Sequence, residues 1–147
     1  MKRILFVDDE RHILDGLRDL LRKYRREWDM EFALGGQAAI SALAERTFDA
    51  VITDMRMPVM DGASLLAQVA GLYPDMVRIL LTGQADLNAA ISAVNDGHIF
   101  RFLVKPCPSE VLRAQLKAAL RQHEHECDES DLPITAANGL EMHGPLG

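Results

Sequence analysis

Five polar side chains follow short apolar runs in this 147-residue sequence, and their types suit chemistry on a phosphoryl group. The runs and their followers are residues 4–7 with Asp8 and Asp9, 50–53 with Asp54, 77–81 with Thr82, and 99–104 with Lys105. Carboxylates held close together repel one another and raise each other's pKa unless a cation binds them. Magnesium suits a site with few carboxylates, since it keeps several waters and shares its shell with a phosphate. With Lys105 as a fixed positive charge and Thr82 as a hydroxyl donor, the set indicates phosphoryl transfer to a carboxylate.

The elements that must position these residues are visible as a change of apolar period along the chain. Strands are expected at residues 4–7, 31–34, 50–53, 77–81 and 99–104, and helices at 11–26, 37–46, 63–72, 87–94 and 109–122. This alternation predicts an α/β fold with a doubly wound parallel sheet covered by helices on both faces. Ligands bind such sheets outside the carboxyl ends of the strands. If the first and third strands are neighbours, Asp8, Asp9 and Asp54 converge at one edge, and Thr82 and Lys105 reach it from the far side.

Composition limits the kind of protein this is. A hydrophobic fraction of 48% over this length supports one domain with a core and is too short for two ordinary domains. The net charge of -6, from 16 basic and 22 acidic residues, argues against direct binding of nucleic acid by electrostatics. No signal peptide and no membrane-length apolar run is visible, and Cys107 and Cys127 lack metal or redox spacing. We therefore expect a cytoplasmic location without membrane contact.

Each of these candidate site residues also has a purely structural explanation when it is taken alone. Asp8 and Asp9 can favour a helix amino terminus, and Asp54 can be an ordinary turn residue. Thr82-Gly83 is a common end to a strand, and Lys105-Pro106 is an ordinary surface turn. The chemical interpretation is preferred because four such features fall in order at successive ends of one predicted sheet.

The chain carries, in order, Asp8-Asp9, Asp54 with Met57-Pro58 and Asp61-Gly62, Thr82-Gly83, and Lys105-Pro106. This order and spacing resemble the receiver domain of two-component response regulators over about residues 2–122. The resemblance implies a flavodoxin-like (βα)5 fold with strand order 2-1-3-4-5. It also implies a receiver domain over residues 1–122. Because the apolar periodicity ends after about Gln122, we expect residues 123–147 to be a flexible carboxyl-terminal tail or the start of a linker.

The resemblance assigns a role to each site residue. Asp54 would accept a phosphoryl group, and Mg²⁺ would be held by Asp8, Asp9, Asp54 and the backbone carbonyl of Arg56. Thr82 would be the switch hydroxyl, and Lys105 would bind the phosphoryl group from the other side. The Lys105–Pro106 peptide bond is a candidate for the cis form.

Three further positions follow from the same resemblance. Phe102 occupies the switch position, and its inward turn would reshape the face formed by the fourth helix, fifth strand and fifth helix. Arg56 and Gln84 would tune the lifetime of the phosphoryl group. The phosphoryl donor would be a sensor histidine kinase or a phosphotransfer protein.

The output is expected to be a protein–protein interaction. It would reach a downstream partner or an output domain outside these residues, such as an HD-type phosphodiesterase-like domain, and phosphorylation could promote a homodimer. Two other functions remain open at this point. An aspartate-nucleophile phosphohydrolase would need a second aspartate where Arg56 stands, so we expect no enzyme acting on an external substrate. A binding module that works without phosphorylation would not need the complete set of acids, threonine and lysine.

Overall fold

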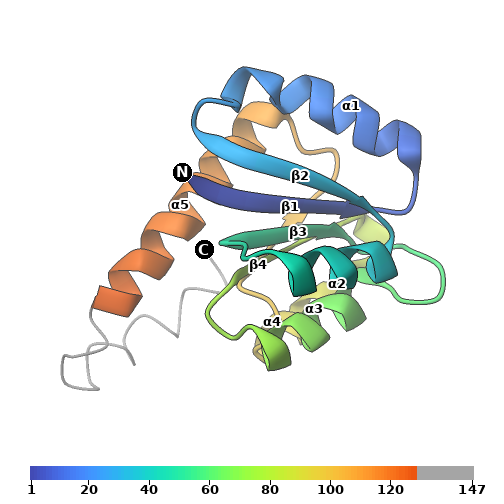
Figure 1. The fold of residues 1–147 in the computed structure, drawn as a ribbon. Coiled ribbons are helices and arrows are strands. Elements are labelled where there is room, and N and C mark those ends of the chain that lie inside the picture. Colours follow the sequence, from blue (N-terminus) through green and yellow to red (C-terminus); the bar gives the residue numbers. More distant parts are fainter. Residues whose placement is uncertain (129–147) are drawn as a thin grey trace.

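Five parallel strands form the centre of the molecule, in the order β2-β1-β3-β4-β5 (Figure 1). The structure is a computed structural model that describes the backbone of residues 1–128 and the side chains of residues 1–124. The strands are β1 (Lys2–Asp8), β2 (Trp28–Leu34), β3 (Ala50–Asp54), β4 (Val77–Thr82) and β5 (Arg101–Val104). The helices are α1 (Arg11–Leu21), α2 (Gly36–Glu45), α3 (Gly62–Leu72), α4 (Leu87–Asn95) and α5 (Ser109–Asp128), with the 3-10 turns η1 (Arg22–Tyr24) and η2 (Gln84–Asp86). The flavodoxin-like α/β fold and the strand order are confirmed.

Helices cover both faces of the sheet, which explains why the central strand β3 is buried throughout and β1 carries a continuous apolar run. In β1, Leu5 and Val7 pack into the layer formed by α2, α3 and α4. Ile4 and Phe6 point the other way, into the layer that contains α5 and the end of α1. Figure 1 shows these two helical layers on opposite sides of the sheet. Because successive side chains alternate between faces, a continuous apolar run fills both layers at once.

Several element boundaries differ from the sequence-based prediction, and three of them have a clear cause or consequence. The helix expected to reach residue 26 ends at Leu21 and continues as the single 3-10 turn η1. β2 begins at Trp28 rather than at residue 31, because Trp28 pairs with Lys2 at the start of β1. β5 begins at Arg101 rather than at residue 99, because its pairing with β4 starts opposite Ile79. In the last two cases strand pairing, which local sequence does not reveal, decides where the strand begins.

The last helix also extends further than expected. The apolar periodicity ends near Gln122, but α5 continues to Asp128, so residues 123–128 belong to this helix. A helix makes its backbone hydrogen bonds internally, so it can outrun its apolar face. Glu124 supports the extension, since its carboxylate lies 3.1 Å from the ammonium of Lys2 on β1. The tail or linker predicted for residues 129–147 lies outside the described residues.

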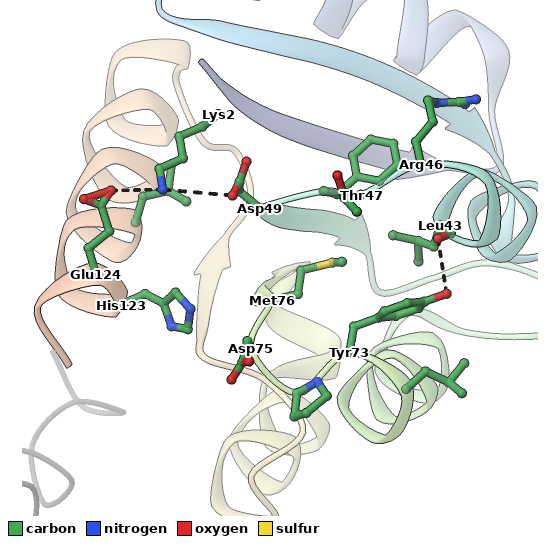
Figure 2. Close-up of a pocket in the computed structure, with 14 residues that line it drawn as sticks. Lys2, Leu43, Arg46, Thr47, Asp49, Tyr73, Asp75, Met76, His123 and Glu124 are labelled. Carbon is green, nitrogen blue, oxygen red and sulfur yellow. Dashed lines mark hydrogen bonds and ion pairs between the residues drawn. The ribbon is translucent and has the colours of Figure 1, made fainter. Parts of the chain in front are cut away.

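A cavity of about 660 Å³ opens at the amino-terminal edge of the sheet, beside α5 (Figure 2). Lys2 lies between Glu124 and Asp49 there, with the Asp49 carboxylate 4.0 Å from the Lys2 ammonium. On the other side the Tyr73 hydroxyl donates to the Leu43 carbonyl over 3.2 Å. That carbonyl lies in the last turn of α2, where helix carbonyls lack intrahelical partners. Lys2 therefore joins β1 to α5 and to the loop before β3, and Tyr73 joins the end of α3 to α2.

Candidate functional site

The opposite edge of the sheet collects the acidic residues. Asp8 ends β1 and Asp54 ends β3, and these strands pair directly, with Val7 opposite Thr53. Asp9 follows in the loop after β1. One carboxylate oxygen from each of the three aspartates lies within 4.8 Å of the others. The sequence expectation that these side chains converge therefore holds in the structure.

Two of the three carboxylates are buried, which affects their charge. Asp8 is 8% exposed and Asp54 is 6% exposed. Burial raises the pKa of the Asp8 carboxyl, and the charges of Asp54 and Asp9 act in the same direction. A hydrogen bond from the Glu10 amide over 3.0 Å opposes the rise, as does the charge of Lys105. The ionised form of Asp8 is therefore disfavoured in the folded chain without a bound cation.

Replacing Asp8 with Asn is expected to raise the free energy of unfolding at neutral pH in the absence of Mg²⁺. A raised pKa means that the folded state binds the Asp8 proton more tightly than the unfolded state, so ionisation above that pKa destabilises the fold. The gain should shrink as pH falls through the raised pKa and vanish once Asp8 is protonated in both states. Urea denaturation of both proteins from pH 3 to 7 measures it, and an advantage that grows toward acid would contradict this assignment.

Lys105 reaches the acidic cluster from the other side. Its ammonium forms an ion pair with the Asp54 carboxylate, although the Lys105 side chain is 46% exposed. The Lys105 amide donates to the Thr82 carbonyl over 2.8 Å, which fixes the loop after β5 against the end of β4. The Lys105–Pro106 peptide bond is cis. The lysine thus places a positive charge on the carboxylate that the sequence analysis singled out.

Thr82 and Phe102 lie on the neighbouring strands β4 and β5. Thr82 is fully buried, and its hydroxyl donates to the Gly83 carbonyl over 3.1 Å. Phe102 is partly buried against the layer that contains α4. The hydroxyl of Thr82 is thus bonded within its own loop in this structure. The switching roles of Thr82 and Phe102 remain predictions.

Arg56 and Gln84 lie in the loops that follow β3 and β4. Gln84 begins η2 and is exposed. The Arg56 guanidinium extends to Asp86, with its Nε 2.7 Å from a carboxylate oxygen of Asp86. Both partners, together with Asp9, line a pocket of about 500 Å³. The metal-binding role of the Arg56 carbonyl remains a prediction. The roles of Arg56 and Gln84 in setting the lifetime of the phosphoryl group also remain predictions.

Sequence analysis missed two residues that shape this site. Asp86 was not singled out, because its partner Arg56 lies 30 residues earlier and no local pattern joins them. Gly62 was noted only as part of a turn. In the structure its amide donates to the Met55 carbonyl over 2.8 Å, and a Cβ there would collide with the Asp54 backbone. The only available signal was a glycine at the start of a predicted helix.

The donor set fits a hard divalent cation. All three side chains offer carboxylate oxygens, and the raised pKa of Asp8 reflects carboxylate charges close to it as well as burial. Oxygen ligands in small number, with room for water, suit Mg²⁺. A bound Mg²⁺ would neutralise charge on a phosphoryl group beside Asp54. Lys105 would contribute a second positive charge there.

Comparison with known proteins identifies the family. A family model for the response regulator receiver domain matches residues 4–117. The chain belongs to this family. Receiver domains act in two-component systems, are generally signalling switches rather than enzymes, and generally bind Mg²⁺ at an acidic pocket. The receiver domain described here has its acidic cluster at the same edge of the sheet as Thr82 and Lys105.

Several relatives are larger than this receiver. The transcriptional regulatory protein ZraR of Escherichia coli is 32% identical over 134 residues, which cover 91% of this chain and 30% of that protein. The DNA-binding transcriptional regulator NtrC of Salmonella typhimurium is 35% identical over 99 residues, covering 67% of this chain and 21% of the regulator. The chain thus spans about a third or less of the length of these curated relatives.

Solved structures of similar chains agree with the fold. The signal receiver domain of an HD domain-containing protein from Pseudomonas fluorescens is 38% identical, covers 84% of this chain and 98% of its own, and superposes with a TM-score of 0.76. A structure described as adenylate cyclase from Rhodopirellula baltica is 32% identical, with coverage of 89% and 96% and a TM-score of 0.80. Among residues 1–128, no helix combines the length and apolar character required to cross a bilayer.

Proposed function

We propose that this receiver is a phosphorylation-dependent switch in which Asp54 accepts the phosphoryl group. The observation that carries the proposal is the convergence of three carboxylates within 4.8 Å, with Lys105 paired to Asp54. Mg²⁺ would be held by Asp8, Asp9, Asp54 and the carbonyl of Arg56. If each of these residues only ended a strand, formed a turn or favoured the start of a helix, nothing would require them all to meet at one edge of the sheet.

The residues divide the chemical work. A carboxylate oxygen of Asp54 forms a bond to phosphorus while the bond from phosphorus to the donor nitrogen breaks, and the electron pair leaves with that nitrogen. Lys105 then pairs with a phosphoryl oxygen rather than with the Asp54 carboxylate alone. Thr82 gives up its bond to the Gly83 carbonyl and donates to another phosphoryl oxygen.

The response spreads from Thr82 to the face formed by α4, β5 and α5. Movement of Thr82 opens space into which Phe102 turns, since the two residues lie on paired strands. Phe102 is only partly buried against the α4 layer, so it can change position without emptying the core. Arg56 and Gln84, in the loops beside the acceptor, would set how long the phosphoryl group lasts.

The partners belong to the proposal as well. The donor would be a sensor histidine kinase or a phosphotransfer protein. The output would be a downstream protein or an output domain, and the receiver of an HD domain-containing protein among the similar structures makes an HD-type phosphodiesterase-like domain a candidate. Homodimer formation on phosphorylation and a cytoplasmic location remain predictions.

Incubation of the chain with acetyl phosphate and Mg²⁺ is expected to give a base-labile adduct, detected as an added phosphoryl mass. Chelation of Mg²⁺ beforehand should reduce its formation by at least about tenfold, because the carboxylates then repel the incoming phosphoryl group. An adduct that forms equally well without a divalent cation would contradict the metal role. Steady hydrolysis of a phosphomonoester would instead favour the phosphohydrolase.

A further inference from the structure

A two-point contact joins the loops on either side of the acceptor. Nε of Arg56 donates to one carboxylate oxygen of Asp86 over 2.7 Å, and Nη2 donates to the other over 3.4 Å. The Asp86 side chain is 20% exposed, whereas that of Arg56 is 72% exposed. The Asp86 carboxylate is therefore the more enclosed partner, and the Arg56 guanidinium has more room to change position.

The contact lies at the mouth of the acidic site. Arg56 is two residues beyond Asp54, and Asp9 lines the same pocket as both partners. The pKa of the exposed Arg56 guanidinium is raised chiefly by its hydrogen bond to Asp86, then by the charge of Asp86, with a smaller contribution from Asp54. Asp86 therefore holds Arg56 directly, and the negative charge of Asp54 acts on the same guanidinium more weakly.

Asp86 also directly precedes α4, as the last residue of η2; its backbone (φ -108°, ψ 13°) is not in the extended conformation of a capping residue, and its side chain makes no capping hydrogen bond. Aspartate is among the best N-cap residues, because its carboxylate accepts from the amides of the second or third helical residue. For α4 these are the amides of Asn88 and Ala89. The Asp86 carboxylate is bonded to Arg56 instead, and capping α4 would require the Asp86 backbone to become extended.

We propose that Asp86 is a positioning residue with two alternative partners, Arg56 in the unphosphorylated chain and the amino terminus of α4 in the phosphorylated one. Bonded to Asp86, Arg56 is held back from the metal-binding carboxylates. A phosphoryl group on Asp54 adds negative charge and draws Arg56 toward it. The released Asp86 then turns to the extended backbone conformation, which opens the last residue of η2, and caps α4, so that the chemistry at Asp54 is linked to the order of that helix. The phosphorylated half of this cycle rests on the proposed function, and the unphosphorylated half does not.

Two substitutions separate pairing from capping. Asp86→Asn removes the charge that holds Arg56 but keeps a side chain that caps well, whereas Asp86→Ala removes both abilities. In the unphosphorylated chain, Asp86→Asn should slow hydrogen exchange at the Asn88 and Ala89 amides by about threefold or more, the usual size of an N-cap effect. Asp86→Ala should not slow exchange there. Slower exchange in both variants, or in neither, would overturn the proposal.

A double-mutant cycle tests whether Asp86 acts through Arg56. Mg²⁺ affinity is measured by calorimetry on unphosphorylated wild type, Asp86→Asn, Arg56→Gln and the double variant. Loss of the Asp86 charge weakens Mg²⁺ binding directly in both backgrounds, but freeing Arg56 should add a further loss of about 2- to 5-fold only where Arg56 is present, which is about 0.4–1 kcal/mol. Equal losses in the two backgrounds would overturn the role of Arg56.

The last measurement follows the acyl phosphate on the full chain. In Asp86→Asn, the freed Arg56 binds the phosphoryl group, so the half-life of the adduct should lengthen by about 2- to 5-fold, and Arg56→Gln should cancel the gain. A half-life that is unchanged by Asp86→Asn would overturn this part of the proposal. If wild type forms no adduct at all, the proposed function fails, while the exchange and Mg²⁺ results still decide the unphosphorylated half.

Discussion

Replacing Asp54 with Asn is expected to abolish the base-labile adduct formed with acetyl phosphate and Mg²⁺. The substitution keeps the size of the side chain but removes the carboxylate oxygen that must bond to phosphorus. Asp54 is 6% exposed and paired with Lys105, so no neighbouring carboxylate has the same access to that lysine. Intact-protein mass measurement should show adduct formation at least about 100-fold lower than in wild type, the scale of losing a reacting group.

A matched control is available at the other end of the sheet. Asp75 is exposed and lines the cavity at the amino-terminal edge. Asp75→Asn makes the same change in charge and should leave adduct formation unchanged. An adduct of wild-type yield in Asp54→Asn would show that another residue accepts the phosphoryl group, and the proposed function would then need a different acceptor.

Replacing Gly62 with Ala is expected to destabilise the fold more than any other single methyl addition at a described glycine. A Cβ at Gly62 would lie 2.9 Å from the Asp54 carbonyl carbon, closer still to its oxygen, and 2.8 Å from Cδ1 of Leu80. The leucine can turn away, but the backbone at the end of β3 cannot. Overpacking of this kind costs about 2–4 kcal/mol, so urea denaturation should show that loss in the free energy of unfolding.

The same helix provides the control. Nothing lies within 4 Å of the position that a Cβ would occupy at Gly71, near the end of α3. Gly71→Ala should be neutral or stabilise the chain by up to about 1 kcal/mol, because alanine favours the helical backbone. If the two variants unfold alike, the close approach of α3 to the end of β3 is contradicted.

The meeting of Asp8, Asp9 and Asp54 was predictable from sequence for a definite reason. The carboxyl ends of parallel strands lie at one edge, and apolar runs show where strands end. Once the alternation of strands and helices fixed the layout, the residues after each run had to lie near one another. Residue type then supplied the chemistry, since clustered carboxylates call for a cation and Lys105 supplies a fixed charge.

The remainder depended on contacts that local sequence does not contain. The pairing of Arg56 with Asp86 joins two loops, and the path of each loop depends on the strands before it. The tight approach of Gly62 to Asp54 likewise depends on how α3 lies on β3 and β4. The ion pair between Lys2 and Glu124, which joins the start of β1 to the last helix, also could not be read from local sequence.

The short strand β5 is divided between the two helical layers. Phe102 packs against the layer of α2, α3 and α4, and the next residue, Leu103, packs into the layer that contains α5. Neighbouring positions on one strand therefore address different helices. Substitutions at Phe102 and at Leu103 therefore alter the packing of different helical layers: the first alters the layer that contains α4, and the second alters the layer that contains α5.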